Sequence, residues 1–466
     1  MPSSHTAHGY WLEEAGPVAP RPALAEPVEA DVVVVGGGYL GLWTAWNLLE
    51  HDPELHVVVL EADRCGHGPS GRNGGFATAL WDDLPELRSR YGDAAALELA
   101  RASSAAVAGL GQWCSDQGVD AWYRRRGHLQ VAAAPAQEGA WSEAVAACAE
   151  LGVAEEFVAL DAAQVAARCG SPVFGGGALM RDGATVQPAR LALGLRAKVI
   201  ERGADVREHA RVRAVRIRDG RAVAVCERGS VTAPAAVLAL GGASAGQRPL
   251  RRRLTVASSH IVLSEPVPDV LADIGWTGGE CIVDCRTFLH YFRTTPEGRV
   301  AFGWAGGRMG YGGRTGGRLE VDPAVVAQAG RDLVRVFPDM AGRRLTHAWG
   351  GPIDVSPTHL PVFGSLHDGR VHYGFGFTGN GVAPSWLGGR VLAGLALDRR
   401  EPETRLALVE PGPVRVPPEP LRYAGGSLIR AAWLRRERLE DAGRSADPLT
   451  RFVTEIPRRL GVHIGR

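Results

Sequence analysis

The sequence has few of the features that mark secreted, membrane-spanning or nucleic-acid-binding proteins. Its 466 residues include seven cysteines and no C-x-x-C pair, which argues against a disulfide framework and favours a reduced, cytoplasmic protein. No apolar run reaches the roughly 18 residues of a membrane span, and the first thirty residues do not resemble a secretory signal. With 52 basic and 51 acidic residues, the formal charge of +1 gives no reason to expect nucleic acid or an anionic membrane as a partner. We therefore expect a small-molecule partner.

Several kinds of catalytic site are also missing. No metal-ligand spacing, nucleophile elbow or pair of carboxylates stands out, so we expect no metal. A second glycine-rich nucleotide fingerprint is absent as well, so we expect one dinucleotide, with oxygen or another small molecule as the electron acceptor. The length, with 45% hydrophobic residues, favours two domains with a large core.

A nucleotide-binding unit begins at Ala30, with the sequence ADVVVVGGGYLGLWTAWNLLE. Its pattern predicts a strand over 31–35, a helix over about 40–50 and a second strand from His56. The glycines at 36, 38 and 41 satisfy G-x-G-x-x-G, which turns the chain, lets a phosphate approach the backbone and allows close helix–strand packing. Glu61 follows 20 residues after Gly41, where a carboxylate accepts hydrogen bonds from a ribose and disfavours a 2′-phosphate. The unit predicts FAD or NAD at the helix N-terminus.

Other local patterns predict the remaining elements. An Arg-Gly turn between alternating residues indicates a hairpin within AWYRRRGHLQVAA, residues 121–133, and the turn at 295–298 indicates a second hairpin between TFLHYFRTT and GRVAFGW. Helices are expected from Pro188 to just before Gly203, near 323–337 and over roughly 427–440. The Pro-rich residues 1–29 contain Tyr10 and Trp11 and are expected to form an ordered arm on the main body.

Four stretches, in chain order, resemble the FAD-dependent D-amino acid oxidase superfamily: VVVVGGGYLGLWTAWNLLE, VVVLEADRCGHGPSGRNGGF, AAVLALGG and VHYGFGFTGNGVAPSWLGGRVLAGLAL. Within them, SGRNGG is similar to the γ-glutamylputrescine oxidase and glycine-sarcosine oxidase-like branch. The resemblance covers about residues 30–400 and implies a mixed α/β fold, in which a glutathione-reductase-like FAD-binding Rossmann domain is interleaved with a mixed-sheet substrate-binding domain. We expect an arm (1–29), an FAD-binding domain (30–85, 185–254 and 345–400), a substrate-binding domain (86–184 and 255–344) and a C-terminal extension (401–466).

The resemblance also implies which residues contact FAD. The pyrophosphate would meet Gly36, Gly38, Tyr39, Leu40 and Gly41, and the adenosine half would meet Glu61, Ala62 and the backbone of Val212. The loop along the flavin and its diphosphate would comprise Ser70, Gly71, Arg72, Asn73, Gly74 and Gly75, with Gly241 nearby. The pyrimidine end of the flavin would meet Gly379, Asn380, Gly381, Val382 and Ala383, whose N–H groups and helix dipole suit an anionic reduced flavin.

The sequence departs from its resemblance in the stretch HAWGGPIDVSPTHLPVFG. The sarcosine oxidase branch has a flavin-binding cysteine in this region and this chain has none, so we expect dissociable FAD, although Cys65 or His67 could in principle form a bond to it. The α-amino acid oxidases have an arginine here that pairs with the substrate carboxylate. No arginine occurs between Trp349 and Pro357, which favours an amine over an α-amino acid.

The candidate substrate residues lie on FLHYFRTT and FGWAGGRMG. Alternation predicts Phe288, His290 and Phe292 on one strand face and Leu289, Tyr291 and Arg293 on the other. By resemblance, Tyr291 falls near a substrate-contacting tyrosine, and Arg293 could meet an anionic substrate tail, although an ordinary amphipathic strand would look the same. Trp304 and Arg308 are weaker candidates, near the place where a sarcosine oxidase lysine assists oxygen reduction.

Together these features predict an FAD-dependent oxidoreductase that oxidises the C–N bond of a small amine to an imine, which water then hydrolyses to a carbonyl compound and ammonia. Hydrogen peroxide would form if oxygen is the acceptor. The alternatives are an oxidase of amino acids or N-methyl amino acids, a flavin monooxygenase, and a non-catalytic flavoprotein subunit. The amine, the acceptor and the oligomeric state stay open at this point.

Overall fold

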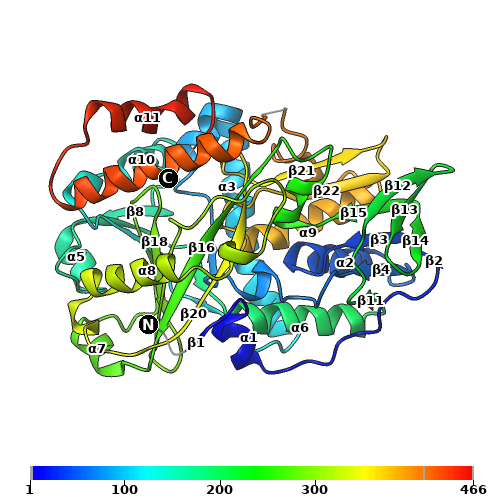
Figure 1. The fold of residues 1–466 in the computed structure, drawn as a ribbon, viewed down its shortest axis with the longest axis horizontal. Coiled ribbons are helices and arrows are strands. Elements are labelled where there is room, and N and C mark those ends of the chain that lie inside the picture. The colour runs from blue at the N-terminus through cyan, green and yellow to red at the C-terminus, as the bar shows by residue number, and fades with distance from the viewer. Residues whose placement is uncertain (1–3, 413–414, 464–466) are drawn as a thin grey trace.

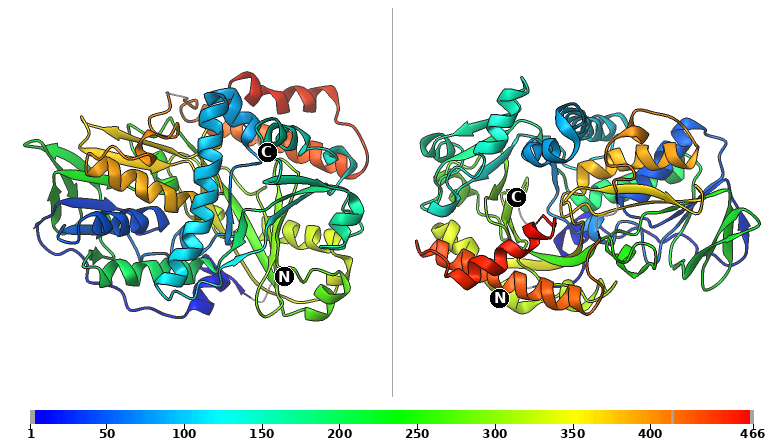
Figure 2. Two further views of the ribbon diagram at one scale, coloured as in Figure 1. Left: turned by 180° about the vertical axis from the view of Figure 1, so that it is seen from behind. Right: turned by 90° about the horizontal axis from the view of Figure 1, so that it is seen from above.

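The computed structural model describes residues 4–412 and 415–463 and contains two large sheets that lie side by side (Figure 1). The long helix α3 (Leu84–Asp116), broken by a non-helical residue at Gly92, stands between the two halves when the molecule is seen from behind (Figure 2). No helix in the described part of the chain combines the length and the apolar character that a membrane span needs.

The six-stranded sheet contains the predicted nucleotide-binding unit. Its order is β11-β4-β3-β15-β22-β21, in which β21 is antiparallel to its neighbour and the other pairs are parallel. The strands are β3 (Val32–Val35), β4 (Val57–Leu60), β11 (Asp205–Arg207), β15 (Ala235–Leu238), β21 (Val362–Leu366) and β22 (Val371–Phe375). Its central strands are continuous apolar runs because both of their faces are covered, as is usual in parallel sheets.

One face of this sheet packs against helices and the other against a small sheet. Val32 and Val34 share a core with α2 (Tyr39–His51), α6 (Pro188–Glu201) and α9 (Val382–Ala396). Val33 and Val35 face the four-stranded sheet formed by β12 (Ala214–Arg218), β13 (Arg221–Val225), β14 (Ser230–Ala233) and β2 (Val28–Glu29). The predicted β-α-β unit and the helix from Pro188 are confirmed within one or two residues at most boundaries.

The nine-stranded sheet forms the other half, in the order β1-β20-β16-β19-β18-β17-β7-β9-β8. Its strands are β1 (Ser4–His5), β7 (His128–Val131), β8 (Phe157–Leu160), β9 (Gly177–Met180), β16 (Thr255–Ser264), β17 (Cys281–Asp284), β18 (His290–Thr294), β19 (Val300–Trp304) and β20 (Leu345–Val355). Helices α7 (Pro268–Asp273) and α8 (Pro323–Val336) pack on one face of it. It also contacts α4 (Ser142–Glu150) and α5 (Ala162–Ala166), which flank β8, and a small sheet of β5 (Phe76–Thr78), β10 (Gly183–Thr185) and β6 (Arg124–Arg125).

Two sequence predictions about this half need correction. The hairpin over 121–133 is wrong, because β6 pairs with β10 in the small sheet whereas β7 pairs with β17 and β9. Residues 345–355, assigned to the FAD-binding domain, form β20, which pairs along its whole length with β16 of the nine-stranded sheet. By contrast, β18 and β19 form the predicted hairpin.

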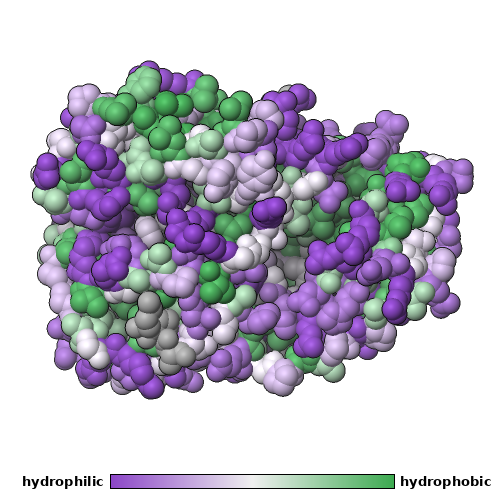
Figure 3. All heavy atoms as spheres, viewed as in Figure 1, coloured by the Kyte–Doolittle hydropathy of each residue, from purple (hydrophilic) through white to green (hydrophobic). Residues whose placement is uncertain are grey.

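Both ends of the described chain pack on this framework. β1 pairs with β20, and α1 (Gly9–Ala15) buries Trp11 against Trp349, so residues 4–15 lie on the main body as expected. The predicted helix near 427–440 is the longer α10 (Leu421–Asp441), and α11 (Pro448–Arg459) was not predicted. Apolar residues gather on the surface over α10 and α11, at the upper left of Figure 3, and include Leu428, Leu449 and Phe452.

Candidate active site

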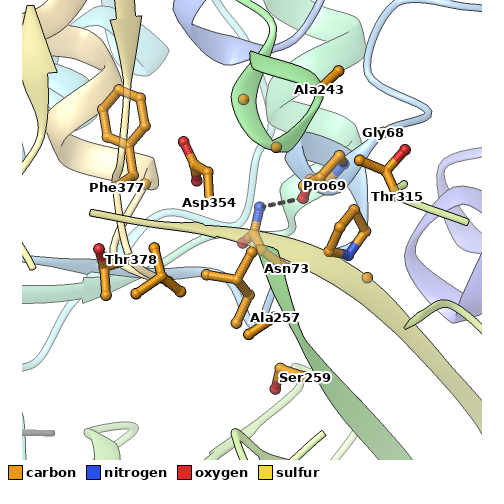
Figure 4. Close-up of a pocket in the computed structure, with 18 of the residues that line it drawn as sticks. Gly68, Pro69, Asn73, Ala243, Ala257, Ser259, Thr315, Asp354, Phe377 and Thr378 are labelled. Atoms are coloured by element: carbon orange, nitrogen blue, oxygen red, sulfur yellow. Dashed lines mark hydrogen bonds between the residues drawn. The ribbon is translucent and has the colours of Figure 1, made fainter. Parts of the chain in front are cut away.

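A cavity of about 1200 Å³ is lined by residues from both large sheets. Single small-molecule sites usually measure roughly 300–1,000 Å³, so this cavity has room for a dinucleotide and a small substrate together. Part of its lining is shown in Figure 4, which labels Gly68, Pro69 and Asn73 of one loop together with Ala257 and Asp354 of two strands.

The start of α2 forms the predicted phosphate-binding end of the cavity. Gly36 has φ +117°, which favours glycine, and Gly38 is the N-cap of α2 without a side-chain capping bond. A Cβ atom on Gly41 would lie 1.9 Å from the Gly36 carbonyl oxygen, so only glycine permits this close helix–strand contact. Gly36, Gly38, Tyr39 and Leu40 line the cavity, whereas Gly41 packs beneath it.

Glu61 lies at the end of β4 and lines the same part of the cavity, together with Ala62 and Val212. Its Oε2 accepts a hydrogen bond from Gly37 N at 2.8 Å and its Oε1 accepts one from Asp63 N at 2.9 Å. An ionised carboxylate has about four acceptor positions, so these backbone bonds leave room for a hydroxyl group. Burial raises the pKa of Glu61, and the backbone N–H donors oppose this shift.

The loop at 68–75 connects the two halves of the cavity. Ser70 Oγ accepts a bond from Tyr39 N at 2.8 Å, and Asn73 Nδ2 donates to Pro69 O at 3.1 Å, as Figure 4 shows, while Asn73 Oδ1 accepts from Gly75 N. Ser70, Arg72, Asn73 and Gly74 line the cavity. Gly71 and Gly75 are not among its lining residues, and a Cβ on either would meet a backbone carbonyl at 2.2 Å.

Arg72 ties this loop to distant segments. Its Nη1 donates to Ala7 O at 2.7 Å and to Glu320 Oε1 at 2.9 Å, and its own carbonyl accepts a bond from Trp349 Nε1 at 2.7 Å. Arg72 therefore fastens the N-terminal arm and β20 to the loop that is predicted to lie along the flavin.

A second uncapped helix N-terminus faces the cavity at the start of α9. Gly379 has φ +89°, and Gly381 is the N-cap of α9 without a side-chain capping bond. The buried Asn380 Oδ1 finds no hydrogen-bond partner among the described residues. Gly241, Gly379, Asn380, Gly381 and Val382 line the cavity, whereas Ala383 is fully buried behind it.

These features fit FAD. Two helix N-termini whose N-cap residues are glycines can each receive an anionic or polar part of the cofactor, although Ser70 Oγ already occupies Tyr39 N at the start of α2. A carboxylate with a free acceptor position suits the ribose. The residues that would hold FAD are therefore those of the α2 start, Glu61, the 68–75 loop and the α9 start.

An aromatic chamber continues the cavity over the nine-stranded sheet. Tyr291 and Phe76 line it, with ring centroids 5.7 Å apart, and the Tyr291 hydroxyl lies 2.7 Å from Ser259 Oγ, which donates to Trp304 O at 2.9 Å. Burial raises the pKa of Tyr291 to about 12, so its hydroxyl stays protonated near neutral pH. Every residue of β20 from Trp349 to Val355 lines the cavity, and none of these seven is an arginine or lysine.

The chain is similar to a family of FAD-dependent oxidoreductases. The family described as "DAO: FAD dependent oxidoreductase" matches residues 31–395. The chain belongs to this family. It is 30% identical over 407 residues to the γ-glutamylputrescine oxidoreductase of Escherichia coli K12, an alignment that covers 84% of this chain and 89% of that protein.

Solved structures show the same family fold. Glycine oxidase from Geobacillus kaustophilus matches with a TM-score of 0.66 at 18% identity, over 80% of this chain and 96% of that one. Iminodiacetate oxidase from Chelativorans sp. BNC1 matches with a TM-score of 0.64 at 18% identity, over 81% of this chain and 99% of that one. The expected mixed α/β fold and the dependence on FAD are thus confirmed for this member of the family.

Of the four predicted catalytic residues, Tyr291 lines the cavity, whereas Arg293, Trp304 and Arg308 are absent from its described lining. Alternation placed Arg293 on the same strand face as Tyr291. Its guanidinium, however, donates to the carbonyls of Val186 and Gly75, so it holds two backbone segments together and does not face the substrate. Burial lowers the pKa of Arg293 to about 10. Trp304 stacks on His290 with ring centroids 6.3 Å apart, and Arg308 Nε donates to Asp322 at 2.8 Å.

Sequence reasoning missed Asp354 and the contribution of the C-terminal extension. Asp354 Oδ2 accepts a bond from Gly376 N at 2.6 Å, its carbonyl accepts from Thr378 N at 3.0 Å, and burial raises its pKa to about 6. It therefore holds the strand end that leads into the α9 loop. The only available sequence signal was a charged residue within an otherwise apolar stretch. The extension contributes lining residues from α10 and from the end of α11, including Gly425 and Leu460.

Proposed function

We propose that this protein oxidises the C–N bond of a small amine that lacks an α-carboxylate, with dissociable FAD as its cofactor. The amine loses two electrons and two protons to become an imine, which water hydrolyses to a carbonyl compound and ammonia. Oxygen, as the proposed acceptor, takes up the two electrons and two protons and becomes hydrogen peroxide. The 30% identity to a γ-glutamylputrescine oxidoreductase supports an amine as substrate.

The observation that carries the proposal is the wall formed by β20. Seven consecutive residues of this strand line the cavity beside the predicted flavin loop, and the position that follows Pro352 is Ile353 rather than a cation. Arg72, the nearest cation on the 68–75 loop, already donates to Ala7 O and Glu320. A substrate carboxylate would therefore lack a bidentate partner on this wall, whereas an uncharged substituent would find apolar contacts.

The protein's own groups position the amine. When bound, FAD supplies the two-electron oxidation by accepting a hydride from the carbon that carries the nitrogen. The aromatic and apolar chamber disfavours a charged ammonium, so it lowers the pKa of a bound amine and favours the neutral form that can be oxidised. The Tyr291 hydroxyl, held by Ser259, can exchange hydrogen bonds with the amine while the surrounding rings exclude water.

Dissociable FAD is supported by the surroundings of Cys65, one of the two candidate linking residues. The Cys65 thiol is buried beneath Gly37, where a Cβ atom on that glycine would lie 2.4 Å from its Sγ, and burial raises the thiol pKa well above its usual value. His67 lines the cavity, and burial lowers its pKa. A thiol kept protonated is a poor nucleophile, so Cys65 is unsuited to forming a flavin bond.

The test is an anaerobic titration of the purified yellow protein. Primary and secondary amines, diamines and α-amino acids are added in turn, and flavin reduction is followed as loss of absorbance near 450 nm. Reduction by amines and not by α-amino acids is expected, with one peroxide formed per amine when oxygen is admitted. Reduction confined to α-amino acids contradicts the proposal.

A further inference from the structure

The C-terminal extension reaches the wall of the chamber through Glu437. This residue lies on α10, beyond the residues 31–395 that match the family, and only 5% of it is exposed. Its Oε1 accepts a hydrogen bond from Phe288 N at 2.9 Å. An acidic side chain is rarely buried so completely unless it has a specific partner, and this backbone N–H is such a partner.

The donor of this bond belongs to the turn between β17 and β18. Thr287, Phe288 and Leu289 line the cavity, and Tyr291 follows two residues after Leu289. The position of this turn therefore decides where the chamber wall lies beside Tyr291. Residues 286–289 lie outside any strand. Leu289 O still accepts a backbone hydrogen bond from Ala305 N at 3.0 Å, whereas Phe288 N donates to Glu437.

A buried charge network holds the two strand ends on either side of the turn. Asp284 Oδ2 lies 2.7 Å from His290 Nδ1 and accepts a bond from Arg286 Nε at 2.9 Å, and His290 Nε2 lies 3.2 Å from Asp332 of α8. Arg286 also donates to Asp441, at the end of α10. Because these strand ends are fixed, the hydrogen bond from Phe288 N to Glu437 attaches the middle of the turn to α10.

The same network sets the charge around Glu437. Arg286, Asp284 and His290 face it from the strand ends, and Asp441 shares its helix. Burial raises the pKa of Glu437 to about 7, although the Phe288 N–H and Arg286 favour its ionised form. Either protonation state keeps an oxygen that can accept from Phe288 N.

We propose that Glu437 is a positioning residue that fixes the chamber wall at 287–289 through Phe288 N and so determines the affinity for the amine. The proposal rests on the amine oxidation proposed above. Glu437 itself touches no reacting atom. Its effect should therefore appear in substrate binding rather than in the limiting rate of flavin reduction.

Three variants separate the hydrogen bond from the charge. Glu437→Ala removes both, Glu437→Gln keeps the accepting oxygen without the charge, and Glu437→Asp keeps the charge but withdraws the oxygen by one methylene. Glu440→Ala is the matched control, because Glu440 lies on the same helix and pairs with Arg436 rather than with the wall. Each variant is melted and titrated with FAD before the kinetic work, to compare folding and cofactor binding with the wild type.

Anaerobic stopped-flow reduction over a range of amine concentrations gives an apparent Kd and a limiting rate. We expect the Kd to rise about tenfold in Glu437→Ala and Glu437→Asp, and less than threefold in Glu437→Gln and Glu440→Ala. The limiting rate and the FAD Kd should stay within twofold. An unchanged amine Kd in folded Glu437→Asp, or a larger loss in Glu437→Gln than in Glu437→Asp, overturns this role alone. Failure of every amine to reduce the wild type overturns the proposed function, and this role falls with it.

Discussion

Replacing Gly41 by alanine tests the phosphate site most directly. The added Cβ would lie 1.9 Å from the Gly36 carbonyl oxygen and 3.2 Å from Val34 Cγ1, so the collision is with backbone and with a buried strand. Restoring an ordinary contact of about 3.4 Å requires the first turn of α2 to move by roughly 1.5 Å. Alanine is otherwise the better helix residue, by about 1 kcal/mol, so any loss comes from the collision.

The size of the effect follows from hydrogen-bond geometry. A backbone N–H that moves by this distance no longer bonds a phosphate oxygen, since such bonds end near 3.5 Å. Each charge-assisted bond contributes about 1.5–3 kcal/mol, so losing one weakens FAD binding by roughly 10- to 150-fold. The assay is a titration of apoprotein with FAD, followed by quenching of flavin fluorescence.

A matched control is Gly330→Ala, within α8. There the nearest atom to an added Cβ is the flexible Leu345 Cδ1 at 3.3 Å, so we expect unchanged FAD affinity and equal or higher stability. If folded Gly41→Ala binds FAD as tightly as the wild type, the start of α2 does not hold the pyrophosphate and the assignment of this site is refuted.

Three further predictions concern the same cavity. Glu61→Gln should weaken FAD binding about tenfold. Because burial raises the pKa of Glu61, the FAD affinity of the wild type should begin to fall on acidification at a pH above the usual carboxylate range. Titrations of the apoprotein at several pH values should show this fall in the wild type and not in the variant. Tyr291→Phe removes the hydroxyl next to Ser259 and should raise the amine Kd about five- to twentyfold in anaerobic titrations, with FAD affinity unchanged; an unaltered amine Kd would exclude the hydroxyl from binding. Acid precipitation should release all of the flavin from the wild type and from Cys65→Ala alike, and flavin retained by the wild-type pellet alone would identify a bond to Cys65.

Local sequence patterns predicted helices, strands and strand faces well, because these features depend on residues that are close together in the sequence. Alternation separated Tyr291, which lines the cavity, from Phe292, which is buried in the core between β18 and α8. The glycine spacing placed Gly36 and Gly38 at the start of α2. In each case the information lies within a few residues, at the period of a strand or in the turn before a helix.

Partners that lie far apart in the sequence could not be predicted in this way. Arg293 faces the expected side, but the carbonyls that receive its guanidinium belong to Gly75 and Val186, 218 and 107 residues away. Similarly, alternation in 121–133 gave the two strands but not their partners, and β6 and β7 joined different sheets. A pattern of period two fixes which face a residue occupies and leaves open which strand lies beside it.

The contacts that hold the chamber have a consequence for how its substrate preference is set. Arg72 connects the flavin loop to Ala7 of the N-terminal arm, and Glu437 connects the 287–289 wall to the C-terminal helix α10. Both Ala7 and Glu437 lie outside the residues 31–395 that match the family, whereas the glycines at α2 and α9 lie inside them. The glycines predicted to hold the cofactor thus belong to the part of the chain that matches the family. The two contacts that hold the surrounding loops, at Ala7 and Glu437, come from segments outside that part. A change in α10 should therefore alter which amine fits before it alters whether FAD binds, whereas a change in the N-terminal arm should also act on the flavin loop.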